Sequence, residues 1–347
     1  MGELATGLHC PGCGQRIGAA DRFCEECGRE LAVYRAALPD LTIDPAAACD
    51  QCGGTDFDDD RYCASCGARH RPPDRAEADL GVVQLITDRG IAHARNEDAV
   101  AAAVLDDASG PTIVIAVCDG VSTSDDPQVA SGTAARTGVD ACLAALAADR
   151  TAAEAVIDGL VAAFEAVRGV SIADGHAPSC TYVSAVLRAC GDGEFEITVT
   201  NVGDSRAYWL RGDGPGDSVA SRRLTADDSY AQLLVDAGGM DEQTAMRDPR
   251  AHALMRWLGA DSEHVPADTA VHSLRVRGPG ALLLCSDGLW NYLPDPTGLA
   301  VVATASAPLR SARDLVEVAL HGGGSDNITV ALAAIPAAAS IPAGGAQ

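Results

Sequence analysis

The sequence predicts an α+β protein in which helices flank two largely antiparallel sheets, with a small cysteine-rich domain in front of them. Apolar runs with strand character cluster along the chain, and alanine-rich stretches with helical character separate these clusters. A doubly wound parallel sheet would alternate strands and helices one for one, so this order argues against that fold. Four CxxC pairs before residue 70 mark the small domain.

Composition and charge narrow the class of protein. The 347 residues are 47% hydrophobic and 21% charged, which suits one large globular domain with room for a small one. The apolar runs are short and interrupted by charge, and no secretion signal opens the chain, so we expect a cytoplasmic protein without a membrane span. The formal net charge of −24 disfavours nucleic acid and anionic membranes as partners and suits a protein that binds cations.

The cysteine-rich part, residues 1–70, is a duplicated unit. The segments "CPGCGQRIGAADRFCEECG" and "CDQCGGTDFDDDRYCASCG" each place ten residues between two CxxC pairs. Two such turns can direct four thiolates at one tetrahedral ion, and so short a unit needs the metal for its folding energy. We therefore predict two structural zinc ions. Their ligands are Cys10, Cys13, Cys24, Cys27, Cys49, Cys52, Cys63 and Cys66.

Disulfides or a redox motif are the alternatives, but disulfides require an oxidising compartment that nothing in the sequence indicates. The unit resembles the double zinc ribbon carried by many bacterial proteins. Residues 1–70 hold twelve acidic and six basic residues, a balance that argues against a nucleic-acid partner. We expect these ribbons to contact protein or to regulate the larger domain.

The larger domain spans residues 80–335. A linker at residues 71–79 ("RPPDRAEAD") precedes it, and a disordered tail at 336–347 follows it. Strands are expected at 80–87, 112–118, 181–187, 195–202, 205–210, 271–276, 281–285 and 328–334. Helices are expected near 128–148, 151–168, 228–237 and 311–320.

Short acidic motifs abut several of the apolar runs. They contribute Glu97, Asp98, Asp119, Asp204, Asp287 and Asp326. A single Asp-Gly is most simply a turn, but a turn does not explain five such motifs together. Several carboxylates at one edge of a structure are costly unless a cation compensates them. Oxygen ligands of this kind suit Mg²⁺ or Mn²⁺ rather than zinc.

The motifs "RNEDAV", "VCDGV", "NVGDSRAYWL", "CSDGLW" and "SDNITV" occur in this order. Together they resemble the metal-dependent Ser/Thr protein phosphatases of the protein phosphatase 2C (PPM) type in their bacterial form. The resemblance covers roughly residues 80–335. It implies an α/β/β/α four-layer sandwich with a two-metal site at one edge. It also implies hydrolysis of phosphoserine and phosphothreonine on proteins by a metal-activated water, with a partner Ser/Thr kinase or its substrates as partners.

The resemblance also implies roles for single residues. Asp119 would bridge two Mn²⁺ or Mg²⁺ ions, and the Gly120 carbonyl would reach one of them. Asp98, Asp287 and Asp326 would ligate the second ion, and Glu97 would hold a metal-bound water. Asp204 would contact a third, weaker ion.

Some positions depart from the family pattern. The phosphate-binding arginine of the family is replaced by His93, with Arg95 two residues later. Either side chain is therefore a candidate phosphate ligand. Val121 stands where eukaryotic members have a histidine, and Asn291 stands where some members have an aspartate. We therefore expect a third metal to bind weakly or not at all.

Two other functions compete with an active phosphatase. One is a catalytically weak or inactive scaffold on the same fold that binds phosphoproteins. Such a scaffold usually lacks one or more acidic ligands, and all of them are present here. The other is a zinc-ribbon nucleic-acid protein, which the acidic charge disfavours.

Overall fold

The computed structural model describes most of the larger domain and parts of the cysteine-rich segment. The described residues are 13, 15, 23–28, 33–39, 48–49, 51–58, 62–68, 75–107, 110–170, 177–191, 193–213, 219–263, 266 and 269–337.

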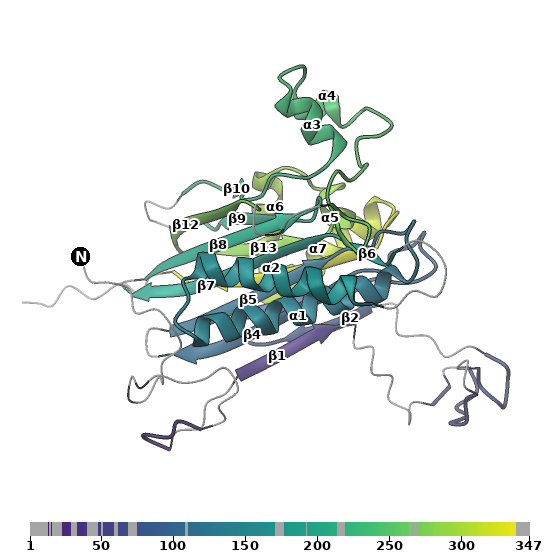
Figure 1. Cartoon of the computed structure of the whole chain (residues 1–347), viewed down its shortest axis with the longest axis horizontal. Coiled ribbons are helices and arrows are strands. Elements are labelled where there is room, and N and C mark those ends of the chain that lie inside the picture. Colours follow the sequence, from purple (N-terminus) through teal and green to yellow (C-terminus); the bar gives the residue numbers. More distant parts are fainter. Residues whose placement is uncertain are drawn as a thin grey trace, which may run out of the picture.

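Two six-stranded sheets form the centre of the larger domain (Figure 1). The first has the order β1-β4-β5-β7-β8-β12, and all its neighbours are antiparallel. Its strands are β1 (Val33–Leu38), β4 (Ala99–Asp107), β5 (Gly110–Cys118), β7 (Tyr182–Gly191), β8 (Glu194–Val202) and β12 (Val271–Arg277).

The second sheet has the order β10-β9-β13-β14-β3-β2, again antiparallel throughout. Its strands are β2 (Arg75–Asp79), β3 (Val83–Asp88), β9 (Arg206–Arg211), β10 (Arg222–Arg223), β13 (Gly280–Cys285) and β14 (Ile328–Ile335). A two-stranded ribbon of β6 (Ser179–Cys180) and β11 (Leu258–Gly259) lies beside them. Antiparallel order in both sheets confirms the predicted fold class.

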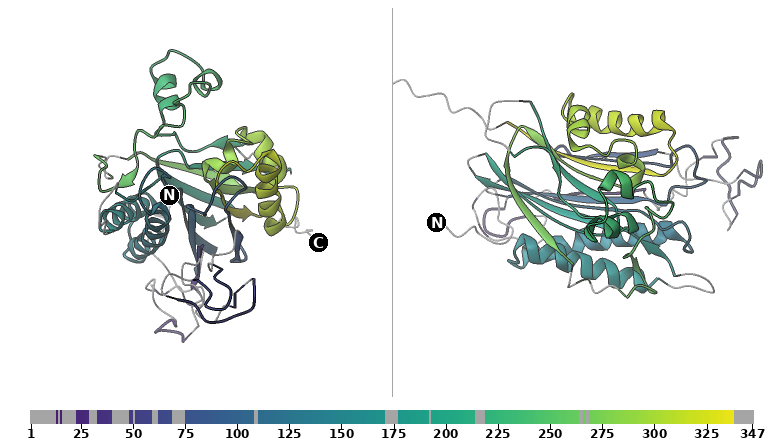
Figure 2. Two further views of the ribbon diagram at one scale, coloured as in Figure 1. Left: turned by 90° about the vertical axis from the view of Figure 1, so that its right-hand side faces the viewer. Right: turned by 90° about the horizontal axis from the view of Figure 1, so that it is seen from above.

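Helices cover the outer face of each sheet (Figure 2). The long pair α1 (Pro127–Ala147) and α2 (Ala152–Arg168) packs on the first sheet. The helices α5 (Asp287–Trp290), α6 (Pro296–Ala303) and α7 (Pro308–Gly322) pack on the second. The short helices α3 (Tyr230–Asp236) and α4 (Glu242–Ala245) follow β10 and precede β11 in the sequence, and they project from the two sheets (Figure 1). We call residues 230–257 the flap.

Buried apolar side chains form three layers, which is what a four-layer sandwich requires. One layer lies between the α1/α2 pair and the first sheet, one between the two sheets, and one between the second sheet and its helices. Strand β4 lies within two of these layers: Ala101 and Ala103 face the helices, while Val100 and Val104 face the other sheet. Its side chains are therefore apolar on both faces, as in any doubly covered strand.

The predicted strands and helices of residues 80–335 are all present within a few residues. Strand β4 and helix α6 were not predicted. The β4 sequence "AVAAAVLDD" is rich in alanine, which favours helix when no partner is considered. Small residues are nevertheless suited to this place, because α1 packs directly on the strand.

Two segments outside the predicted domain belong to its sheets. The last five residues of the expected linker form β2, which pairs with β3 from Arg75–Asp88 to Asp79–Gln84. Strand β1 lies between the two cysteine units in sequence and pairs with β4 from Val33–Leu105 to Leu38–Val100. The cysteine-rich segment is thus attached to the larger domain through the edge of a sheet.

Among the described residues, no helix combines the length and apolar character needed to cross a bilayer. The end of the predicted tail, residues 338–347, lies outside the described residues.

Candidate metal centre and active site

The acidic motifs converge because they follow or precede strands that end at the same edge. In the first sheet, Ala99 pairs with Cys118, so Asp98 and Asp119 lie next to this pair. In the second sheet, Cys285 pairs with Val330, which brings Asp287 near the start of β14 and its preceding Asp326. Antiparallel pairing therefore collects carboxylates that are far apart in sequence.

Backbone contacts between these motifs explain why a glycine follows Asp119 and Asp287. A side chain at Gly288 would place its Cβ 2.0 Å from the carbonyl oxygen of Asn327. At Gly120 the Cβ would lie 2.6 Å from the carbonyl oxygen of Glu97, to which the Gly120 amide donates at 3.2 Å. The glycines are needed for close approach of one motif to the next.

Asn327 fastens the segment before β4. Its Oδ1 accepts a hydrogen bond from the Glu97 amide at 2.7 Å, and its Nδ2 donates to the carbonyl oxygens of Arg89 and Arg95 at 2.7 and 3.0 Å. Because Asn327 is buried and all three bonds reach backbone, this amide fixes the position of the Glu97-Asp98 pair.

The electrostatics of the cluster favour a cation. Burial, assisted by the charges of Asp326 and Asp287, raises the pKa of Asp98 to about 7. Burial and the charges of the neighbouring aspartates hold the pKa of Asp119 well above its ordinary range. Burial and the charge of Asp326 raise the pKa of Asp287 to about 6.

Two oxygens of the cluster are also left without partners. Asp98 Oδ1 and Asp287 Oδ1 are buried and accept no hydrogen bond. A divalent cation that prefers oxygen ligands would offset the repulsion between the carboxylates and would give the two unpartnered oxygens a ligand bond. The residues present therefore fit the Mn²⁺ or Mg²⁺ that the sequence motifs predict.

A cavity of about 530 Å³ opens onto this cluster. Its lining includes five of the predicted site residues, together with the flap and the segment after β5. The predicted residues are Asp119, Gly120, Asp204, Asp287 and Asp326. Asp98 is not in the lining and is almost fully buried, so it can reach only the inner side of a bound ion.

Asp204 is buried at the end of β8, and its carbonyl oxygen accepts a hydrogen bond from Trp290 Nε1 at 2.9 Å. Burial and the charges of Asp287 and Asp227 hold the pKa of Asp204 well above its ordinary range. One Asp204 carboxylate oxygen, one Asp287 carboxylate oxygen and a His252 ring nitrogen lie within 4.8 Å of one another. His252 was not predicted from the sequence, because it lies in the flap with no acidic motif beside it.

The two predicted phosphate ligands both contact acidic residues of the cluster. His93 Nε2 lies 3.1 Å from Asp326 Oδ1, and Arg95 Nε donates to Glu97 Oε1 at 2.7 Å. The other Glu97 oxygen accepts from the Ser122 hydroxyl. Glu97 is thus held between two donors, and Arg95 keeps about half of its side chain exposed at the site.

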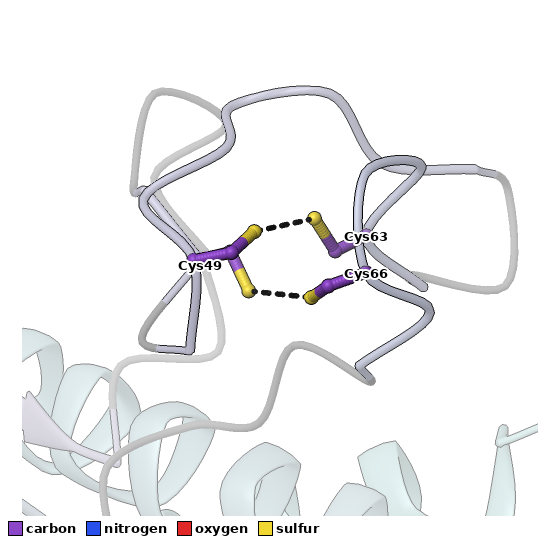
Figure 3. Close-up of side chains that lie close together, drawn as sticks. Cys49, Cys63 and Cys66 are labelled. Carbon is purple, nitrogen blue, oxygen red and sulfur yellow. Dashed lines mark hydrogen bonds between the residues drawn. The ribbon is translucent and has the colours of Figure 1, made fainter.

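The second cysteine unit forms a four-thiol cluster (Figure 3). Cys52 Sγ lies 3.5 Å from Cys63 Sγ, and Cys49 Sγ lies 3.6 Å from Cys66 Sγ. All four sulfur atoms lie within 4.8 Å of one another, as tetrahedral coordination of one zinc ion requires. In the first unit Cys13, Cys24 and Cys27 cluster in the same way, and Cys10 lies outside the described residues.

Comparison with known proteins finds relatives for both the cysteine-rich segment and the larger domain. Residues 10–67 match the double zinc ribbon family. The Ser/Thr phosphatase Stp of Listeria innocua is 34% identical over 152 residues, which are 44% of this chain and 55% of the relative. The Ser/Thr protein phosphatase PstP of Mycobacterium tuberculosis is 30% identical over 249 residues, which are 71% of this chain and 43% of the relative. This chain is a homologue of the PPM-type Ser/Thr phosphatases.

Solved structures of PPM phosphatases show the same fold. The catalytic domain of PstP with two manganese ions superposes with a TM-score of 0.54 at 26% identity, covering 75% of this chain and 97% of that one. The PPM phosphatase MsPP of Mycobacterium smegmatis in complex with cacodylate has a TM-score of 0.55 at 29% identity, covering 75% and 100%. The chain spans about half the length of the two curated relatives, whereas it covers nearly all of the solved domains.

Proposed function

We propose that this chain hydrolyses phosphoserine and phosphothreonine on proteins with the aid of divalent cations at the acidic cluster. The observation that carries the proposal is a set of buried carboxyls with raised pKa values and two unpartnered oxygens, at the floor of an open cavity. Bound Mn²⁺ or Mg²⁺ would supply a water of lowered pKa and polarise the phosphoryl group.

The protein's own residues would hold those cations. Asp119 and the Gly120 carbonyl, directly after β5, would hold one cation, and Asp119 would share the second with Asp98, Asp287 and Asp326. Glu97, fixed by Ser122 and Arg95, would orient a water at the first ion. His93 or Arg95 would bind the phosphate, because both lie beside the ligands at the rim of the site.

We expect a partner Ser/Thr kinase or the substrates of that kinase to supply the phosphoprotein. Cysteines that bind zinc must stay reduced, which favours a reducing compartment such as the cytoplasm. The zinc ribbons would target or regulate the phosphatase domain.

The test is hydrolysis of a phosphothreonine peptide by the full chain, with and without added Mn²⁺. Activity should depend on Mn²⁺ and should be lost in Asp119→Asn, which removes a charge shared between two cations. Asp140→Asn, at an exposed position on α1, is the matched control and should retain activity. A folded Asp119→Asn chain with most of its activity would contradict the two-metal assignment, and a wild-type chain that binds phosphopeptide without hydrolysing it would favour the scaffold.

A further inference from the structure

A histidine of the flap lies within coordination distance of the acidic cluster. A His252 ring nitrogen and one carboxylate oxygen each from Asp204 and Asp287 lie within 4.8 Å of one another. Ligand atoms on one Mn²⁺ at roughly 2.2 Å would lie at most roughly 4.4 Å apart. The three atoms are therefore close to the spacing of a single coordination sphere.

Trp290 holds two of these ligands in place. Its indole Nε1 donates to the Asp204 carbonyl oxygen at 2.9 Å, and its ring stacks on His252 with centroids 5.8 Å apart at 22°. The Arg206 guanidinium covers the Trp290 ring at 3.5 Å and pairs with the buried Asp227 at 2.6 Å. Asp287 and Trp290 are the first and last residues of the short helix α5. This helix therefore carries one of the three ligands and the indole that contacts the other two.

Asp287 has one carboxylate oxygen without a hydrogen-bond partner. Its Oδ2 accepts a hydrogen bond from Asn291 Nδ2 at 3.1 Å, while its buried Oδ1 accepts none. Asn291 stands where some PPM phosphatases have an aspartate. It donates a hydrogen bond to Asp287 and offers no carboxylate to a cation. Asp204 and Asp287 alone would form a two-ligand site.

We propose that His252 is the third protein ligand of a divalent cation bound by Asp204 and Asp287, beside the two catalytic cations. The inference deepens the proposed function, because Asp287 serves both sites. One imidazole with two carboxylates and open positions suits Mn²⁺ or Zn²⁺ better than Mg²⁺, which prefers oxygen ligands alone. Binding at this site also fixes the flap over the cavity, since His252 belongs to the flap.

Pulsed electron paramagnetic resonance of Mn²⁺ on the zinc-loaded full chain tests this assignment. A coordinated imidazole modulates the Mn²⁺ echo through its ¹⁴N nucleus, so the signal reports the ligand independently of activity. The wild-type chain, with Mn²⁺ added beyond its two tighter sites, should show ¹⁴N modulation. His252→Ala should abolish that modulation and weaken the weakest Mn²⁺ site at least about tenfold.

His93→Ala is the matched control, because His93 is the other described imidazole that contacts a carboxylate of the cluster. It should keep the modulation. His252→Asp should lose the modulation but keep a third site, now with higher affinity for Mg²⁺. Modulation that persists in His252→Ala, or that disappears in His93→Ala instead, overturns the proposal. Mn²⁺-dependent hydrolysis without any ¹⁴N modulation refutes this inference alone, whereas ¹⁴N modulation without hydrolysis refutes the proposed function alone.

Discussion

The Ser286 hydroxyl donates a hydrogen bond of 2.7 Å to Asp98 Oδ2, across 188 residues of sequence and between the two sheets. The same hydroxyl oxygen accepts from the Thr329 amide at 3.0 Å, and the Asn327 carbonyl oxygen is a more distant acceptor for its proton at 3.4 Å. Both side chains are buried. One oxygen of Asp98 is therefore fixed by protein, and the other, Oδ1, is left for a cation.

Ser286→Ala should weaken Mn²⁺ binding about tenfold, because Asp98 loses the partner that orients it. Calorimetric titration of Mn²⁺ into the full chain measures the change. The control is Ser311→Ala in α7, a buried serine whose hydroxyl is hydrogen-bonded to the backbone of Ser306, just before the helix. That variant should lower stability without changing Mn²⁺ affinity. Equal Mn²⁺ affinity in Ser286→Ala and wild type would show that Asp98 is positioned by packing alone.

Metal binding should release protons near neutral pH. The pKa of Asp98 is raised to about 7 and that of Asp287 to about 6 when no cation is bound, so both carry protons part of the time at pH 6. A cation must displace these protons, and Mn²⁺ affinity should therefore rise as the pH climbs through 6 and 7. Calorimetry at pH 6 in buffers of different ionisation enthalpy measures the release. No release at pH 6 would show that the two aspartates are ionised before metal binds.

His93→Arg should lower KM for a phosphopeptide, with a smaller effect on kcat. An arginine restores a permanent charge with two donors for the phosphate, where histidine offers one. If His93 is the phosphate ligand, Arg95→Ala should change KM little. A tenfold rise in KM for Arg95→Ala, about 1.4 kcal/mol if KM tracks Kd, together with an unchanged KM for His93→Ala, would assign phosphate binding to Arg95.

Deleting residues 1–74 should leave the acidic cluster intact but destabilise the domain. The sequence places a linker at residues 71–79, so a chain without the cysteine units would be expected to fold as a separate domain. The structure adds that β1 pairs along β4, whose first residue follows Asp98 directly. Loss of β1 exposes a strand edge and the apolar contacts of Leu38. We expect Tm to fall by roughly 2–4 °C for each kcal/mol of stability lost in a domain of this size.

A chain that begins at residue 31 is the matched comparison, because it keeps β1 without the first cysteine unit. It should retain more of the wild-type Tm than a chain that begins at residue 75. Thermal denaturation and light scattering distinguish the two, since an uncovered β4 edge should also promote self-association. Identical Tm values for both chains would mean that β1 contributes nothing to the domain.

Substitution of one cysteine tests the zinc site of the second cysteine unit. Cys63→Ser should lower the zinc content by one ion per chain, because four thiols surround a single position. Elemental analysis measures this, with Cys142→Ser in the α1 core as the control. Cys142→Ser should cost stability but no zinc. An unchanged zinc content in Cys63→Ser would exclude the predicted site.

Local sequence pattern was sufficient to predict the strand-rich sandwich and the cysteine units, and it supplied the acidic residues proposed for the site. These features depend on local pattern: apolar runs that end at an aspartate, and CxxC pairs at fixed spacing. The side chains that support the site became visible only in the folded chain. Ser286 and Trp290 belong to the motif "CSDGLW", but the motif does not show that Ser286 contacts Asp98 or that Trp290 contacts Asp204 and His252. These contacts join residues that are distant in sequence. The same holds for β1 and β4, whose strand conformation comes from pairing with each other and from burial, because intrinsic preference alone does not favour it.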